Sequence, residues 1–192
     1  ATGKYDRNRP FYNTVSPSMD ILISSNLERL LYLLSGGDDK LVAGYMKELS
    51  DTGCYQVSGE MLEKIQSVFV GGFSSEAETE ATIGKMMDEH KYLIDTHTAV
   101  AFHVLEQYRK DTGDQTPAVV ASTASPFKFC DAVLDALNVT DKATGTALLD
   151  QLADVSGMPA PQPLATLKDK KVRFTSWTEK EQMRTVVTDF LK

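Results

Sequence analysis

The stretch AVVASTASPFKF, residues 118–129, decides the fold class that the sequence predicts. Its first four residues, Ala118–Ala121, form a short apolar run that is typical of a buried strand. A helix is expected to follow, because Ser125 can cap it and Pro126 takes the first helical position, where the missing N–H of proline costs nothing. A strand that leads directly into a helix indicates an α/β arrangement.

Helical patterns cover most of the chain on both sides of this stretch. Helices are expected from Ser25 to Gly36, over 39–50, from Ser58 to Val68, over Ser75–His90, from Asp95 to Tyr108, over 141–155 and after Thr178. Capping boxes are expected at Ser25/Glu28 and at Thr178/Glu181. Strands are expected only at 21–23, 55–57 and 118–121. The predicted fold class is therefore α/β, mostly helical with a few short strands. Three short strands make a poor sheet, so we expect something outside this chain to complete it.

Composition excludes several classes of protein. The chain has 192 residues, enough for one domain, with 42% hydrophobic and 24% charged residues. Lys and Arg total 20 against 27 Asp and Glu, and such an acidic balance disfavours nucleic-acid binding, which needs clustered basic residues. No run approaches 18 apolar residues, and the first twenty residues lack a signal-peptide pattern. We therefore expect a soluble, cytoplasmic protein with no nucleic-acid or membrane partner.

The cysteines and histidines do not predict a metal site. Cys54 and Cys130 stand 76 positions apart without a paired ligand nearby, so both are expected to be reduced. His90, His97 and His103 show no HxxxH spacing. No metal is therefore expected.

The first candidate site is the pair Ser122 and Thr123, at the end of the expected strand 118–121. In open α/β sheets, ligands bind at the carboxyl ends of strands, where helix N-termini point free N–H groups. The alternative is that both residues serve only as turn and cap residues.

The second candidate is His97, in the first turn of the helix that Asp95 is expected to cap. Thr96 and Thr98 flank it with hydroxyl groups. The alternative is a hydrogen-bonded histidine of the core. A third candidate is the segment 16–29, in which the turn Ser24–Asn26 could seat an anion at a helix N-terminus, although the capping box already explains Ser25 and Glu28.

Three stretches together resemble one enzyme family. They are TVSPSMDILISSNLERLLY (14–32), YLIDTHTAVAF (92–102) and VVASTASPFKF (119–129), and they occur in family order. They resemble the C-terminal part of threonine synthase, a lyase that uses pyridoxal phosphate. The resemblance spans nearly the whole chain and implies the second of the common pyridoxal-phosphate folds.

The resemblance also implies roles for individual residues. Thr123, beside Ser122, matches the hydroxyl residue that hydrogen-bonds the pyridine nitrogen of the cofactor. A hydroxyl does not enforce a protonated pyridine, so it moderates the electron sink. His97 and Thr98 match a motif that is assigned to the wall of the substrate pocket.

Two parts of the family pattern are missing from this sequence. The Schiff-base lysine and the glycine-rich phosphate loop lie upstream of the matched region in the family. Lys128 superficially looks like a cofactor lysine, but it falls outside the apolar face of its helix, so we expect a surface residue. Residues 1–192 are therefore expected to form a single C-terminal region of threonine synthase without the cofactor-lysine region. Ala1-Thr2-Gly3, without an initiator Met, agrees with a fragment.

The resemblance implies a reaction for the parent enzyme: O-phosphohomoserine and water give threonine and phosphate. The fragment alone is expected to be inactive and to bind no pyridoxal phosphate. Apolar surface that once faced the missing region would favour self-association. The alternative function is a non-catalytic binding or interaction module that shares this fold.

Overall fold

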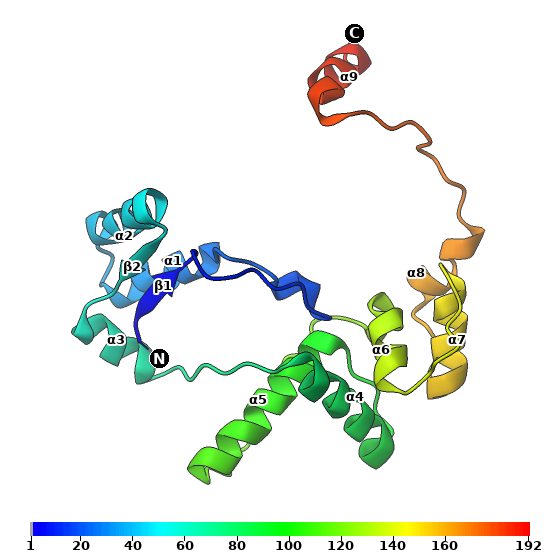
Figure 1. The fold of residues 1–192 in the computed structure, drawn as a ribbon, viewed down its shortest axis with the longest axis horizontal. Coiled ribbons are helices and arrows are strands. Elements are labelled where there is room, and N and C mark those ends of the chain that lie inside the picture. The colour runs from blue at the N-terminus through cyan, green and yellow to red at the C-terminus, as the bar shows by residue number, and fades with distance from the viewer. Residues whose placement is uncertain (1) are drawn as a thin grey trace.

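Two separate hydrophobic cores organise the chain in the computed structural model, which describes residues 2–192 (Figure 1). The first unit contains β1 (Lys4–Asp6), α1 (Ser25–Leu34), α2 (Asp39–Thr52), β2 (Cys54–Gln56) and α3 (Gly59–Gln66). The second contains α4 (Glu76–His90), α5 (Thr96–Thr112), α6 (Cys130–Ala136), α7 (Ala147–Ser156) and α8 (Gln162–Ala165). Single turns of 3-10 helix are η1 (Pro17–Met19), η2 (Pro126–Lys128), η3 (Leu167–Asp169) and η4 (Lys180–Gln182), and α9 (Met183–Phe190) ends the chain.

The first unit is built on a two-stranded antiparallel ribbon. β1 pairs with β2 so that Tyr5 lies opposite Tyr55, and the two rings stack with centroids 5.3 Å apart. Tyr45 from α2 stacks on the other side of Tyr55 at 5.1 Å. The remaining buried side chains of this core are Leu31, Val42, Leu49, Val57 and Met61. The aromatic stack thus joins the ribbon to α2.

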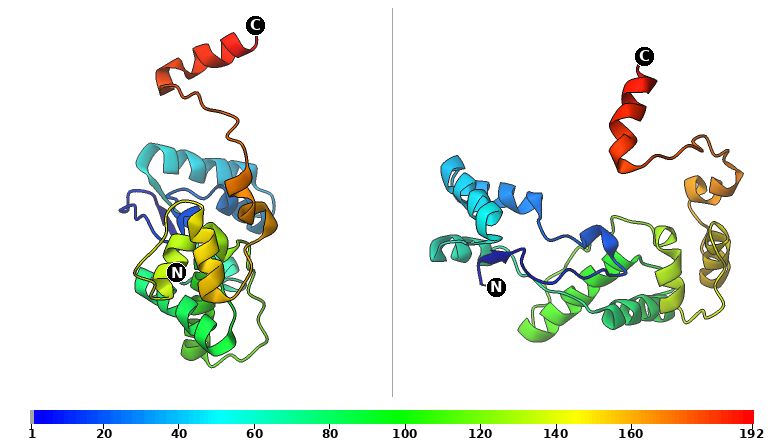
Figure 2. Two further views of the ribbon diagram at one scale, coloured as in Figure 1. Left: turned by 90° about the vertical axis from the view of Figure 1, so that its right-hand side faces the viewer. Right: turned by 45° about the horizontal axis from the view of Figure 1, so that its top comes forward.

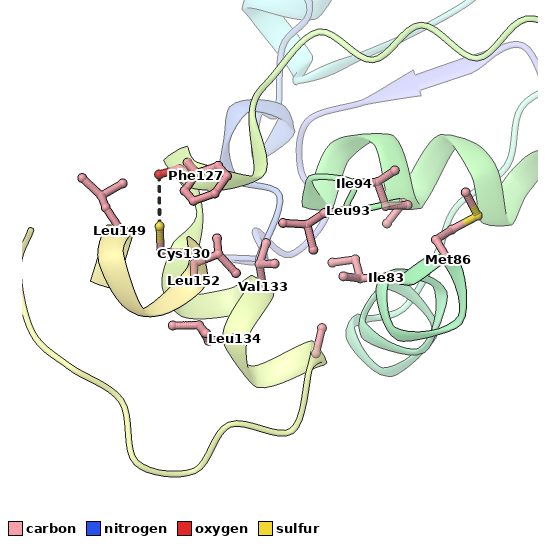
Figure 3. Close-up of a cluster of buried hydrophobic side chains, with 12 residues drawn as sticks. Ile83, Met86, Leu93, Ile94, Phe127, Cys130, Val133, Leu134, Leu149 and Leu152 are labelled. Carbon is pink, nitrogen blue, oxygen red and sulfur yellow. Dashed lines mark hydrogen bonds between the residues drawn. The ribbon is translucent and has the colours of Figure 1, made fainter. Parts of the chain in front are cut away.

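The second unit packs α4 against α5 and α6, and α6 against α7. Its buried side chains come from these helices and from the segment between α4 and α5, and they include Ile83, Met86, Leu93, Ile94, Val133, Leu134, Leu149 and Leu152 (Figure 3). The Cys130 thiol donates to the Phe127 carbonyl at 3.2 Å inside this core. This unit holds the residues of the candidate site.

Two of the three predicted strands are wrong. Ala118–Ala121 belongs to no strand of the described sheet, and Val119 is 98% exposed. Residues 21–23 are also irregular, and Ile21 and Ile23 are exposed. A strand exists only where a neighbour supplies hydrogen bonds, and apolar character alone does not provide one. The third prediction, 55–57, is confirmed within one residue by β2.

The predicted helices are confirmed in order, with local corrections, and the structure adds α8, which was not predicted. The Ser25/Glu28 capping box is wrong, because Ser24 is the N-cap of α1 and makes no side-chain capping bond. The Thr178/Glu181 box is wrong as well, because Glu179 precedes η4 without a side-chain cap. The helix predicted for 141–155 begins only at Ala147, and the helix after Pro126 begins with the 3-10 turn η2. Residues 2–192 are thus mostly helical, with two short strands.

The C-terminal tail leaves the second unit after η3 and ends in α9, away from both units in every view (Figure 2). The apolar side chains of α9 and of its C-cap Leu191 recur at helical spacing and are all exposed: Met183, Val186, Val187, Phe190 and Leu191. Among residues 2–192, no helix combines the length and the apolar character that crossing a membrane requires.

Candidate functional site

Three segments far apart in the sequence meet at the N-terminal end of α5. The Ser18 N–H in η1 donates to Nε2 of His97 at 3.2 Å. The hydroxyls of Thr98 and Ser122 lie 3.0 Å apart. The structure therefore joins the first and second predicted candidates, and it adds the segment 14–20, which overlaps the start of the third candidate, 16–29.

Asp95 lies at the centre of this meeting point and is completely buried. It is the N-cap of α5, as predicted, and its Oδ1 accepts from the backbone N–H groups of His97 at 2.9 Å and Thr98 at 3.4 Å. Its Oδ1 also lies 3.1 Å from Nδ1 of His97, and Oδ2 accepts from the Thr98 hydroxyl. These bonds compensate the high cost of burying a carboxylate.

The contacts of His97 define one tautomer. Nε2 accepts the Ser18 N–H, so the ring proton is on Nδ1, from which it is donated to Asp95. The ring lies against Phe129, with centroids 4.8 Å apart and an interplanar angle of 56°. Both ring nitrogens are engaged with the protein, so His97 in this arrangement has no free lone pair to act as a base.

The hydroxyl of Thr98 connects Asp95 to Ser122. The Thr98 hydroxyl is the donor toward both Asp95 Oδ2 and Ser122 Oγ, so its one hydrogen is shared between these two acceptors. Thr98 is buried, whereas Ser122 and Thr123 are exposed. Ser125 caps the next turn, since its Oγ accepts from the Phe127 N–H at 3.3 Å. The turn 122–125 thus presents the Thr123 side chain outward, fixed on both sides by hydrogen bonds.

The segment 14–20 forms a closed loop. The carboxylate of Asp20 accepts from the Thr14 N–H at 2.8 Å and from the Thr14 hydroxyl at 2.7 Å. These bonds, with a smaller contribution from His97, lower the pKa of Asp20. The Val15 N–H also donates to Glu76 of α4 at 2.9 Å. The loop is therefore attached to both α4 and α5.

An open cavity of about 630 Å³ adjoins the site. Its walls come from the loop 14–20, from η2 and α6, and from α7 and α8, and they include Val15, Phe129, Cys130, Leu149 and Leu164. Cys130 is buried, and burial raises the pKa of its thiol. Lys128 borders the cavity as an exposed residue, as expected.

The other candidates stay outside this site. The turn Ser24–Asn26 lies in the first unit, where the Ser24 N–H donates to the Tyr5 hydroxyl. Cys54 and Cys130 are free thiols in different units. Within the part of the chain that the structure describes, three or more potential metal ligands do not cluster anywhere.

Sequence reasoning missed Asp95 as the centre of the site and treated it only as a helix cap. The signal available was its place in the Asp95-Thr96-His97-Thr98 run, but a sequence does not reveal burial of a cap. It also missed Ser18 and Asp20, whose roles depend on contacts 79 and 6 positions away.

Known proteins are similar in sequence to this chain. The family model "Threonine synthase, C-terminal" matches residues 98–187. Threonine synthase-like 1 of Homo sapiens is 36% identical over 160 residues, which cover 82% of this chain and 21% of that protein. Threonine synthase of Saccharomyces cerevisiae is 34% identical over 205 residues, which cover 99% of this chain and 38% of that protein.

Two solved structures have the same fold over nearly the whole chain. The crystal structure of threonine synthase from yeast matches 99% of this chain and 38% of its own, with a TM-score of 0.80 and 30% identity. The PLP-bound threonine synthase from Brucella melitensis matches 98% of this chain and 36% of its own, with a TM-score of 0.74 and 31% identity. The chain thus spans about a fifth to two fifths of the length of the relatives described. The chain belongs to the threonine synthase family, in which it corresponds to the C-terminal part of the fold.

Proposed function

We propose that this chain is the C-terminal part of a pyridoxal-phosphate-dependent lyase that converts O-phosphohomoserine and water to threonine and phosphate. The observation that supports this most directly is the joining of the family stretches at one point by Asp95, His97, Thr98 and Ser122. Pyridoxal phosphate, when bound, would supply the electron sink for the reaction. The chain's own residues would bind and orient it.

The turn 122–125 fits the ring of such a cofactor. Thr123 is exposed and its neighbours Ser122 and Ser125 are held by hydrogen bonds, so its hydroxyl is available to a ligand. A neutral hydroxyl can hydrogen-bond a pyridine nitrogen without requiring that the nitrogen be protonated. We assign Thr123 to this contact and Ser122 to its support.

His97 and Thr98 would form a neutral, rigid wall beside the cofactor. The imidazole holds its single proton on Nδ1 and meets the 14–20 loop through Nε2. Its role in this proposal is to fix the shape of the pocket, since a ring with both nitrogens engaged moves no proton.

The catalytic lysine and the phosphate-binding loop would come from the part of the enzyme that precedes this region in the family. Lys128, as an exposed side chain, is not assigned to the cofactor. The unpaired extended run 118–121 with its exposed Val119 agrees with a surface that another part of the enzyme covers. The chain by itself is proposed to be inactive and to bind no cofactor.

A grafting experiment tests this function. Residues 1–192 replace the matching C-terminal part of yeast threonine synthase, and threonine formation from O-phosphohomoserine is measured. The expected result is turnover that Thr123→Val lowers at least tenfold, that Thr123→Ser retains, and that Lys128→Ala leaves unchanged.

A folded graft that binds pyridoxal phosphate and forms no threonine would contradict the proposal and favour the non-catalytic binding module. Equal turnover of the Thr123→Val graft and its parent would contradict the assignment of Thr123. Loss of pyridoxal phosphate binding with Lys128→Ala would contradict an upstream lysine.

A further inference from the structure

A fully buried carboxylate occupies a position where an exposed serine would be enough to cap a helix. α3 and α4 in the same chain are capped by Ser58 and Ser75, whose hydroxyls accept the same kind of backbone bond. Asp and Ser cap helices about equally well. Burial of a carboxylate, in contrast, costs several kcal/mol unless hydrogen bonds compensate it. Capping alone therefore does not explain why Asp95 is completely buried.

The two carboxylate oxygens of Asp95 serve two different segments. Oδ1 faces the Nδ1–H of His97 at 3.1 Å, and the same imidazole accepts the Ser18 N–H on its other side. Oδ2 accepts from the Thr98 hydroxyl, which also donates toward the Ser122 hydroxyl at 3.0 Å. One branch thus leads to the loop 14–20 and the other to the turn that presents Thr123.

We propose that Asp95 is the positioning residue of the site: it holds His97 in the Nδ1–H tautomer and, through Thr98, holds the Ser122–Thr123 turn. The inference rests on the proposed function only in one respect: the turn that Asp95 holds is the proposed cofactor contact. The hydrogen bonds that carry the inference all lie within this chain.

Different substitutions remove the two branches of hydrogen bonds separately. Asp95→Asn keeps a carbonyl oxygen for the Nδ1–H of His97 and still caps α5, whereas Asp95→Ala removes both. Thr98→Val has a similar shape and removes only the branch to Ser122. Thr82→Val is the matched control, because Thr82 is also buried in a helix but bonds the Glu78 carbonyl at 2.7 Å, in α4.

Ring nitrogen-15 NMR of the chain measures the first branch at neutral pH. In the unsubstituted chain and in Asp95→Asn, Nδ1 of His97 is expected to have the chemical shift of a protonated nitrogen and Nε2 that of an unprotonated one. In Asp95→Ala the ring is expected to become a mixture of tautomers. A proton on Nε2 in the unsubstituted chain, or an unchanged pattern in folded Asp95→Ala, would overturn this half of the proposal.

Backbone relaxation measures the second branch. Thr98→Val is expected to lower the amide order parameters of Ser122 and Thr123 from rigid values of about 0.85 to below about 0.6, and Thr82→Val is expected to leave them unchanged. Unchanged order parameters in Thr98→Val would overturn the role of this branch. Because neither measurement needs cofactor or turnover, an inactive graft with these NMR results would refute the proposed function and leave the positioning role intact.

Discussion

Asp20 shows how a single side chain controls the approach of the loop 14–20 to the site. Its carboxylate holds both the N–H and the hydroxyl of Thr14, and the same loop supplies the Ser18 N–H to His97. The hydrogen bonds from Thr14 are the main reason why the pKa of Asp20 lies below its ordinary value. Ionisation of Asp20 therefore favours the closed loop.

The expected pH dependence follows from this direction. A carboxyl whose pKa is lowered by folding stabilises the folded form above its unfolded pKa, and this contribution is lost as the pH falls through the lower, folded value. Acid below the ordinary value of 3.8 should accordingly open the loop. Carbon-13 NMR of the Asp20 carboxyl and hydrogen exchange of the Thr14 amide measure the two events together. Asp20→Asn should open the loop at neutral pH, and an Asp20 that titrates at or above 3.8 would contradict the account.

At the residue scale, the sequence predicted which residues belong together better than what each one does. Sequence analysis selects His97, Thr98 and Ser122, and in the structure His97 and Thr98 both bond Asp95, while Thr98 bonds Ser122. The importance of Asp95 could not be predicted, because a cap in a sequence is the same letter whether it is exposed or buried. Contacts such as that of Ser18 with His97 depend on the packing of loops with no periodic pattern.

Helix caps illustrate the element scale, because the predicted capping box at Ser25 and Glu28 does not form, whereas one that was not predicted does. Ser25 and Glu28 have the right spacing, yet the cap of α1 is Ser24. Ser75 and Glu78 have the same spacing and form both reciprocal bonds, with the Ser75 N–H donating to Glu78 at 2.8 Å. The pattern allows a capping box, and the path of the chain before the helix decides whether it forms.

The N-termini of α1 and α4 provide a matched pair of substitutions. Ser75→Ala removes the hydroxyl that accepts from the Glu78 N–H, so it should lower the free energy of unfolding of the second unit by about 1 kcal/mol. Ser25→Ala removes no capping bond and should change it by less than about 0.5 kcal/mol. Urea unfolding followed by circular dichroism measures both, and equal effects would contradict the capping difference.

Strands were predicted less well than helices for a physical reason. A helix satisfies its backbone within its own segment, so spacing and caps in the sequence nearly suffice. A strand needs a partner, and the runs 21–23 and 118–121 find none in the described sheet. The ribbon of β1 and β2 formed where Tyr5 and Tyr55 could stack across it, which no local pattern predicts.

At the scale of the whole molecule, the described chain has two hydrophobic cores, an aromatic one around Tyr55 and a mainly aliphatic one between α4 and α7. Units with separate cores unfold separately when few contacts connect them.

Alkaline pH should unfold the two units unequally. Tyr55 is only 3% exposed, and burial, with smaller effects of Tyr5 and Tyr45, raises its pKa to about 12. A group whose pKa is raised by folding stabilises the folded form fully below its unfolded pKa near 10, and the contribution is lost as the pH rises to about 12. The first unit should therefore lose about 2 to 3 kcal/mol over this range.

Amide NMR signals of α2 and of α6 report the two units separately during this titration. The α2 signals should disappear first, and Tyr55→Phe should remove most of the difference. Simultaneous loss of both sets of signals in the unsubstituted chain would indicate a single cooperative unit.

The tail has a consequence for how the folding of this chain can be observed. Trp177 is the only tryptophan, and it lies between η3 and α9 with 83% of its surface exposed. Its fluorescence therefore reports the solvent exposure of the tail. The emission maximum should barely change while both cores unfold. The tyrosine stack of the first unit and the helices of the second are the natural optical reporters, whereas a quenching or blue shift of Trp177 would signal that the tail has found a binding surface.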